Sequence, residues 1–308
     1  MKIVNRRLWY FAIAAVLVLI SIVSLATVKI KTGVDFSAGT LFSIHFDQLP
    51  TRDALRAQLD SMGYQSATVE PATGGQYQYY IRTHQLDQTQ NNDFQSALTA
   101  KFGIMQVTTE TVDPAVASEA VRNAVIAIIV AVIVMLLYIA WAFRKMPNPF
   151  KYGVCAVAGL AFDLMMALGA YSILGAVRGW QVDLMFISGI LAVLGFSINN
   201  TIIVFDRMRE NTSRGISPDI EVVADYSIVQ TLGRSFNSSL TALFTLFVLS
   251  LFVGSSIENF VMVLIIGVIS GVFTSTFLSP ELLVAWQKKN WGSFSGKTVD
   301  LAAAKAKS

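Results

Sequence analysis

The stretch from Leu184 to Asn211 constrains the fold more than any other part of the chain. It reads LMFISGILAVLGFSINNTIIVFDRMREN, and its first part is apolar enough to cross a bilayer. Ser197, Asn200 and Thr201 nevertheless lie well inside it, three and four residues apart, so a helix would place them on one face. Amides within hydrocarbon are costly unless they face protein or water. A polar face of this kind is typical of the interior of a transporter or channel.

Composition indicates a polytopic membrane protein. Of its 308 residues, 54% are hydrophobic and only 14% are charged, whereas a soluble domain carries about a quarter charged residues. The net charge of +3 gives no reason to expect nucleic-acid binding. Cys155 is the only cysteine, so an internal disulfide and a Cys/His metal cluster are both excluded, and no metal role is expected for His45 or His84.

The hydropathy pattern predicts six spans, each near the ~20 residues that a bilayer requires. The first follows the basic segment MKIVNRR and is interpreted as an uncleaved anchor, because its apolar run is longer than that of a signal peptide. Lysines and arginines gather before the first span, in alternate connections and after the last span, so both termini are expected to be cytoplasmic. The predicted spans are residues 9–28, 120–142, 152–174, 184–205, 237–254 and 258–286.

Residues 29–119 have the composition of a soluble external domain. Their patterns predict the order β-α-β-β-α-β of the ferredoxin-like motif. Asn92 or Asp93 is expected to cap the second helix, and Gly103 to end it. The segment has no catalytic constellation, which favours a binding or gating module. The strands are expected at 41–46, 67–71, 76–83 and 104–112, and the helices at 51–63 and 91–103.

The predicted architecture is therefore a polytopic α-helical membrane protein with a small external α+β domain after its first helix. Residues 1–28 form the N-terminus and first span, and residues 29–119 the external domain. Residues 120–290 form a bundle of five helices, in which the pair Gly267 and Gly271 permits close helix packing. Residues 291–308 are expected to be a disordered cytoplasmic tail.

Asp163 is the only acid deep within a predicted span, in the third. Acids in such positions mark ion and proton pathways, so Asp163 is a candidate for ion coupling. The alternative is a structural acid, held by hydroxyl groups or by an arginine of a neighbouring helix or subunit.

Arg234 precedes the fifth span and is the second charged candidate. It could be an anchor whose side chain snorkels to the membrane boundary. It could instead face inward as the partner of an acid, either Asp163 or one on another subunit. A polar stripe continues its helical face and favours the second alternative; the stripe comprises Asn237, Ser238, Thr241 and Thr245.

Three segments carry a resemblance to a known family. GVDFSAGT at 33–40 resembles the signature Gly-Val/Ile-Asp-Phe-x-Gly-Gly-Thr, with Ala38 in place of one glycine. VLGFSINNTIIVFDRMREN at 193–211 resembles a fourth-span motif that ends in Phe-Asp-Arg-Ile-Arg-Glu-Asn, and residues 229–243 are similar to the entry to a fifth span. On these segments the chain resembles, over roughly 1–290, the SecF family of the SecDF complex in bacterial protein export. The motif positions matched are Gly33, Asp35, Phe36, Gly39, Asp206 and Arg207.

This resemblance implies a function in the bacterial inner membrane. The expected role is an accessory subunit that uses an ion gradient, together with a SecD-type partner, to promote export of preproteins through a SecYEG-type translocon. The SecF family is in turn similar to half of an RND-type transporter, so ion-coupling candidates are Asp163, Arg234, Asn200, Ser197 and Thr201. The expected partners are the SecD-type subunit, the SecYEG-type translocon, secreted preproteins and membrane lipid, and no nucleic acid.

Asn200 departs from the family pattern, which commonly has aspartate at this position. An amide has no accessible pKa, so Asn200 cannot carry a proton, although it can hydrogen-bond a water or an ion. Asp206 and Arg207, with Arg209 and Glu210, are expected to form a charge cluster that positions the end of the helix.

Two rival functions are kept beside the export motor. One is an RND-type exporter half for small molecules or lipids, which would require a second large external domain or a fused repeat. The other is a passive structural subunit of the translocon, which the amide at position 200 favours. We expect no enzyme activity and no cofactor, because the sequence contains no Ser-His-Asp set, P-loop or metal motif.

Overall fold

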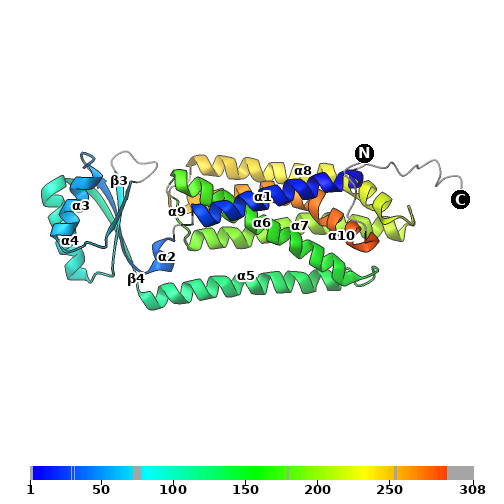
Figure 1. Cartoon of the computed structure of the whole chain (residues 1–308), viewed down its shortest axis with the longest axis horizontal. Coiled ribbons are helices and arrows are strands. Elements are labelled where there is room, and N and C mark those ends of the chain that lie inside the picture. The colour runs from blue at the N-terminus through cyan, green and yellow to red at the C-terminus, as the bar shows by residue number, and fades with distance from the viewer. Residues whose placement is uncertain are drawn as a thin grey trace. The chain divides into compact units, whose positions relative to one another are not determined.

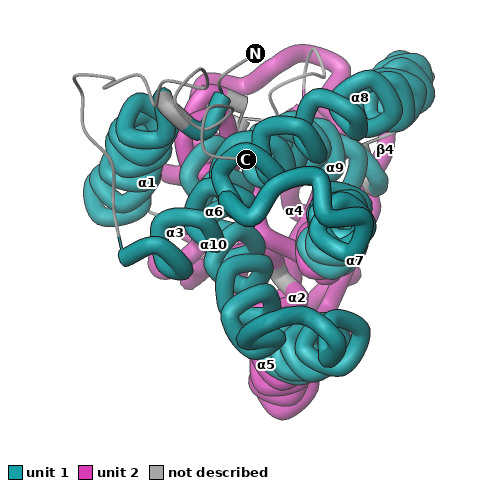
Figure 2. The backbone as a smooth tube through the Cα atoms, turned by 90° about the vertical axis from the view of Figure 1, so that its right-hand side faces the viewer, with its two compact units in different colours: residues 1–27, 128–170, 188–308 teal, residues 28–127, 171–187 magenta. Residues whose placement is uncertain are grey.

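Two compact units divide the chain in the computed structural model, which describes residues 3–28, 30, 32–71, 78–178, 180–252 and 255–289. The first unit comprises residues 1–27, 128–170 and 188–308, and the second comprises residues 28–127 and 171–187 (Figure 2). Long apolar helices dominate the first unit, and a four-stranded sheet lies in the second. The predicted fold class, a polytopic helical protein with a small α+β domain, is confirmed.

Six helices in the described residues are long and apolar enough to cross a membrane (Figure 1). They extend beyond the predicted spans, because polar residues limit an apolar run without ending a helix. The sixth is composite, with a π-helical turn in its middle. The bounds are α1 Arg7–Thr27, α5 Pro114–Ala142, α6 Pro149–Arg178, α7 Leu184–Ser213, α8 Ile220–Phe252, α9 Ser255–Phe273, η2 Thr274–Leu278 and α10 Ser279–Lys288, with a short 3-10 helix η1 at Val4–Arg6.

The spanning helices differ in how much of their surface this chain covers. The apolar windows of α6 and α7 are each 50% buried, and that of the sixth span is 56% buried. The corresponding fractions are 6% for α5 and 11% for α8. Consequently α6, α7 and the sixth span form the inner layer of the first unit, and α5 and α8 present most of their apolar surface outward.

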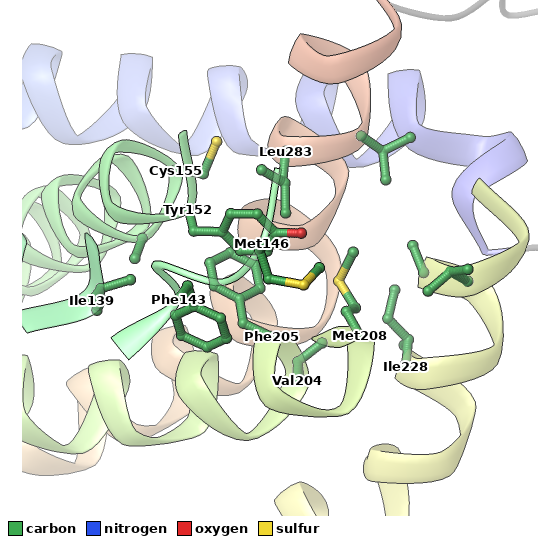
Figure 3. Close-up of a cluster of buried hydrophobic side chains, with 14 of the residues drawn as sticks. Ile139, Phe143, Met146, Tyr152, Cys155, Val204, Phe205, Met208, Ile228 and Leu283 are labelled. Atoms are coloured by element: carbon green, nitrogen blue, oxygen red, sulfur yellow. The ribbon is translucent and has the colours of Figure 1, made fainter. Parts of the chain in front are cut away.

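An aromatic cluster joins the inner helices at one end of the first unit (Figure 3). Phe143 stacks on Tyr152 with ring centroids 5.3 Å apart, and Phe205 meets both rings edge-on. The thiol of Cys155 is buried in the same cluster. Such stacked and T-shaped pairs stabilise packing beyond the area they bury, and here they fix α6 against α7.

Gly267 and Gly271 place α9 directly against α7. A Cβ atom added at Gly267 would collide with the side chain of Val193, and one at Gly271 would lie 3.4 Å from the Cβ of Ser197. The pair therefore acts as the close-packing motif that its spacing predicted.

The second unit contains the predicted β-α-β-β-α-β order. Its sheet is antiparallel with strand order β2-β3-β1-β4. Phe42 of the sheet stacks on Phe94 with ring centroids 4.1 Å apart, at the centre of the domain core. The elements are β1 Gly39–Phe46, α3 Arg52–Ser61, β2 Thr68–Pro71, β3 Gln78–Thr83, α4 Gln88–Phe102 and β4 Ile104–Val112.

The start of α4 corrects one prediction. Its cap is Asp87, whose side chain accepts from the backbone N–H of Gln90 while Gln90 bonds back to Asp87. Asn92 and Asp93 lie inside the helix, because this reciprocal capping box satisfies the backbone N–H groups several residues earlier. Gly103 ends α4 as predicted, with φ of 64°. Residues 72–77, between the second and third strands, and the predicted tail at 291–308 lie outside the described residues.

The signature at 33–40 ties the short helix α2, Val34–Ser37, to the start of α7 within the second unit. The N–H of Gly33 donates to the carbonyl of Val182 at 2.6 Å, and the carboxylate of Asp35 accepts from the backbone N–H of Leu184 at 3.0 Å. An acid at a helix N-terminus is favourably placed for the helix dipole. Asp35 therefore serves as a structural link.

Ala38 in this signature has a conformation that favours glycine. Its φ is 54° and its ψ is 161°, a region that is nearly restricted to glycine and costs of order 1–3 kcal/mol for other residues. We expect Ala38→Gly to stabilise the protein by about 1 kcal/mol, since relief of this strain exceeds the added entropy of the unfolded chain. Thermal unfolding of the detergent-solubilised chain measures the change. Ala100→Gly, on the exposed face of α4, is the control and should destabilise by roughly the same amount. Destabilisation by both variants would show that Ala38 is unstrained.

Candidate functional site

Asp163 of α6 is the centre of a buried polar site formed by three helical segments. Its side chain is 0% exposed. One carboxylate oxygen accepts from the hydroxyl of Thr274 in η2 at 2.6 Å, and the other accepts from the hydroxyl of Ser197 in α7. Asp163, Ser197 and Thr274 are called the carboxylate site below. The hydrogen-bond partners of Asp163 in this chain are therefore hydroxyl groups, and not an arginine of a neighbouring helix.

Small residues let these helices approach closely enough for the hydroxyls to reach Asp163. Gly159 lies one turn before Asp163 on α6, and a Cβ atom there would collide with Ser279 and lie 2.6 Å from Thr274. Gly271 plays the same role opposite Ser197. The glycines of α6 and α9 thus bring three backbones together around one carboxyl group.

The π-helical turn η2 positions Thr274. In this turn the N–H of Ser279 bonds to the carbonyl of Thr274, five residues back. Pro280 follows, and its missing N–H and fixed φ limit how the helix continues. Single π-helical turns inserted in α-helices are frequent at functional sites, and this one directs Thr274 toward Asp163.

Asn200 and Thr201 lie beside the carboxylate site without contacting Asp163. Both are about 1% exposed. The amide of Asn200 donates to the hydroxyl of Ser239 in α8 at 3.4 Å, and the hydroxyl of Thr201 donates to the carbonyl of Ser197 at 3.2 Å. The polar face predicted for α7 is therefore covered by helices of this same chain.

Arg234 does not face the interior of this chain, and this corrects the expectation that it could pair with Asp163. It is exposed, together with Asn237, Thr241 and Thr245 along one stripe of α8. The opposite face of α8 is buried, at Ser227, Thr231, Ser235 and Ser239. Helical geometry allows only one of these faces to meet α7, and the smaller serine residues fit that contact. The alternatives that remain are a membrane anchor and the partner of an acid on another subunit.

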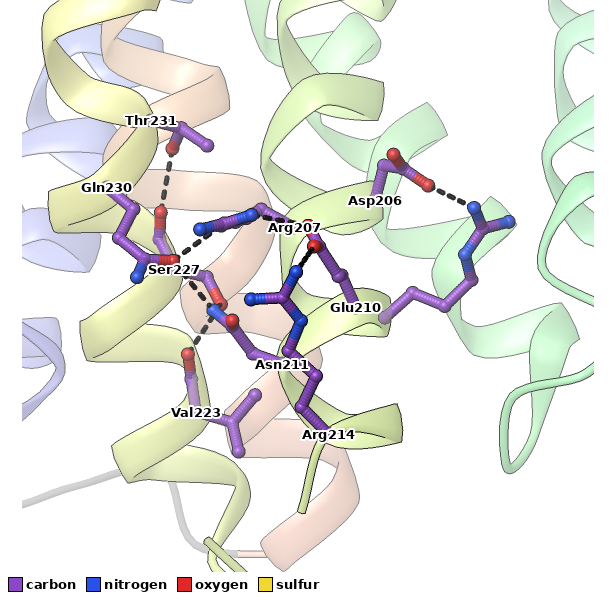
Figure 4. A network of polar contacts seen from close by, with 10 residues as sticks. Asp206, Arg207, Glu210, Asn211, Arg214, Val223, Ser227, Gln230 and Thr231 are labelled. Atoms are coloured by element: carbon purple, nitrogen blue, oxygen red, sulfur yellow. Dashed lines mark hydrogen bonds and ion pairs between the residues drawn. The ribbon is translucent and has the colours of Figure 1, made fainter. Parts of the chain in front are cut away.

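A second polar network joins the ends of α7 and α8 (Figure 4). Arg207 donates to Gln230 at 2.5 Å and pairs with Glu210, and Asp206 pairs with Arg209 at 2.6 Å. Asn211, 0% exposed, donates to the hydroxyl of Ser227 at 2.8 Å and to Gln230 at 3.1 Å. Exposed ion pairs contribute little to stability, so the buried amide of Asn211 is the stronger link between the helices.

Sequence reasoning missed Thr274, Asn211 and Glu281. Threonine at 274 gave no periodic signal, because the π-helical turn shifts the register by which faces are predicted. Asn211 lay in a segment interpreted as an exposed charge cluster. Glu281 lay inside the predicted sixth span, at 258–286, but was not recognised as an acid within it. The sequence Ser-Pro-Glu at 279–281 was the available signal.

The architecture and the carboxylate site define a class: a polytopic membrane protein with polar groups buried between its helices and one external α+β domain. The family model described as "Protein export membrane protein SecD/SecF, C-terminal" matches residues 93–289. The chain belongs to the SecD/SecF family of protein-export membrane proteins.

Relatives named as protein translocase subunit SecF match along nearly the whole chain. The protein from Thermobaculum terrenum is 33% identical, over 98% of this chain and 99% of the relative. That from Haemophilus influenzae is 32% identical, over 89% of this chain and 82% of the relative. The fold resembles the crystal structure of SecDF from Thermus thermophilus, with a TM-score of 0.82 and 25% identity. That match covers 94% of this chain and only 39% of the SecDF chain.

The carboxylate site generates a stability prediction. Thr274→Val keeps the shape of the side chain and removes its donor to Asp163, so we expect a loss of about 1–3 kcal/mol. Thr276→Val is the matched control in the same π-helical turn, because Thr276 is buried without contacting Asp163, and its effect should be smaller. Thermal unfolding in detergent compares them. Equal losses from both variants would mean that the Thr274 hydroxyl does not stabilise the carboxylate site.

Proposed function

We propose that the chain is the SecF-type subunit of a protein-translocase accessory complex. With a SecD-type partner, it uses an ion gradient to promote export of preproteins through a SecYEG-type translocon. The single observation that carries this proposal is Asp163, a fully buried carboxyl group bonded to two other helical segments.

Asp163 can couple ion binding to movement because its carboxylate is hydrogen-bonded to two neighbouring helical segments. A change of its protonation or ion occupancy alters the hydrogen bonds to Ser197 in α7 and Thr274 in η2 together. One charge crossing 100 mV releases about 2.3 kcal/mol, which is comparable to the net value of two or three hydrogen bonds. The gradient thus supplies enough energy to rearrange this site.

The need for a SecD-type partner rests on two features of the outer surface. The stripe of α8 headed by Arg234 is exposed on a helix otherwise apolar enough to face lipid. Asn199 of α7 is exposed as well. Such groups in hydrocarbon need protein or water beside them, and a second bundle would provide both an interface and an acid for Arg234.

The proposed location is the bacterial inner membrane, with both termini cytoplasmic and lipid around the outer faces of α5 and α8. This orientation rests on the lysines and arginines near the chain termini and in alternate connections. The α+β domain of the chain is proposed to be an external binding or gating module without enzyme activity.

Two observations bear on the rival functions. A small-molecule or lipid exporter half would carry a second large external domain or a fused repeat, and the described part of the chain has one sheet. A passive structural subunit is favoured by Asn200, whose amide cannot release a proton. Asp163 favours the coupled role, because it remains available as an ionisable group.

Export into inverted membrane vesicles, with and without an ion gradient, tests the coupled role. We expect Asp163→Asn to abolish the part of export that depends on the gradient, because the amide cannot bind and release a proton. Asp93→Asn, an identical charge change on the exposed surface of α4, is the control and should leave export unaltered. Gradient-dependent export that persists in an assembled Asp163→Asn complex would leave only the passive role.

Arg234 offers a second test. Arg234→Lys keeps the charge but loses the planar fork of donors, so we expect partial gradient-dependent export, and little from Arg234→Ala at equal membrane levels. Full activity of Arg234→Ala would reduce Arg234 to a membrane anchor.

A further inference from the structure

Glu281 is a buried acid that neither the carboxylate site nor the polar network at the end of α7 uses. It lies near the start of α10 and is 0% exposed. Neither of its carboxylate oxygens has a hydrogen-bond partner in the part of the chain that the structure describes. An ionised carboxylate in this situation is unusually costly, because it has lost water and gained no donor.

Two bases near Glu281 are bonded to other acids. Arg7 of α1 pairs with Glu221 of α8 at 2.7 Å. Lys288 of α10 pairs with Asp219 at 2.8 Å and with Glu221 at 3.2 Å. Burial raises the pKa of Asp219, but the hydrogen bond and charge of Lys288 together with the backbone N–H of Glu221 outweigh burial and leave that pKa below its usual range.

A further acid lies close by. Asp225 of α8 accepts from the backbone N–H groups of Ile3 and Val4, at 2.7 and 2.8 Å, and these donors favour its ionised form against the larger cost of burial. Asp225 and Glu221 repel a negative charge on Glu281, and Arg7 attracts it. The described groups facing this region from each neighbouring element are Arg6, Arg7, Tyr10, Lys151, Tyr152, Cys155, Glu221, Asp225 and Lys288.

We propose that Glu281 is a proton-binding site, separate from the carboxylate site, at the end of the bundle where α1 begins and α10 ends (Figure 1). Charge favours it: Glu281 lies among Asp219, Glu221 and Asp225, and the ion pairs of Arg7 and Lys288 are made with Glu221 and Asp219 rather than with Glu281. A proton from solution adds to a carboxylate oxygen and converts Glu281 into a neutral acid that apolar surroundings accept.

The proton is preferred over a metal cation on geometric grounds. In the described ranges, no three histidine, cysteine, aspartate or glutamate side chains gather as ligands. A sodium ion normally requires several oxygen atoms around it, whereas a proton requires one. Both would supply one positive charge, and the experiment separates them by varying sodium at fixed pH.

Release of this proton would loosen the packing of α10. The resulting charge would face Asp225 and Glu221 across the contact of α10 with α8. Glu281 thereby links solution pH to the joint between α1, α8 and α10. This site does not depend on ion coupling at Asp163, so either proposal can fail alone.

Infrared spectroscopy of the full chain in lipid vesicles, made with carboxyl-¹³C glutamate, tests the proposal. Among the other glutamates, Glu110 and Glu119 are exposed, and Glu210 and Glu221 pair with bases. We expect one isotope-shifted band of a protonated carboxylic acid, which disappears in Glu281→Gln and persists in Glu221→Gln. Above its midpoint, the protonated fraction should fall about tenfold for each further pH unit.

The sodium arm repeats the measurement at fixed pH, with choline replacing sodium. A band unaffected by this exchange supports a proton site. Absence of the glutamate band in the wild-type chain at neutral pH would overturn the proposal, and so would a band displaced by sodium. Since both readings come from the wild-type chain, they hold even where Glu281→Gln is unstable.

Discussion

The hydrogen bonds that Asp163 accepts from Ser197 and Thr274 are the interactions on which the inner layer of the bundle depends. A carboxyl group in an apolar interior must have donors, and here they come from two different segments. This requirement explains why α9 approaches α7 at Gly271, why α6 approaches η2 and α10 at Gly159, and why the sixth span contains a π-helical turn. The close backbones are the condition under which short hydroxyl side chains can reach the acid.

The same chain exposes polar groups elsewhere, and the contrast between its two polar faces is informative. The face of α8 with Ser235 and Ser239 is buried against this chain, whereas the face with Arg234 is open. On α8 the small hydroxyl side chains thus lie on the buried face, and the long charged side chain lies on the exposed face. The serine face serves packing within this chain, and the arginine face is exposed on it.

The sequence predicted the architecture well because its strongest signals are periodic. Apolar runs located six spans, and alternation located the strands of the external domain. Asp163, Ser197 and Asn200 were also found, since polar residues are conspicuous within apolar runs. The hydrogen-bond partners of these residues were harder to predict. Thr274 depends on a local change of helical register, and the cap at Asp87 depends on a reciprocal bond with Gln90 that other polar residues nearby could also have made. The sequence did not show that Arg234 points outward. Helix α8 carries two polar stripes, and either could have packed against the rest of the chain.

The π-helical turn has a mechanical consequence. It holds one residue more than an α-helical turn spanning the same rise, so its conversion to α-helix would carry that surplus residue along the helix. An α-helix advances about 100° per residue, so α10 would rotate by roughly that angle relative to α9. Glu281, which follows the turn, would then rotate with α10 relative to Asp225 and Glu221 of α8. A conformational change confined to one helical turn would in this way alter the surroundings of an acid that lies beyond it.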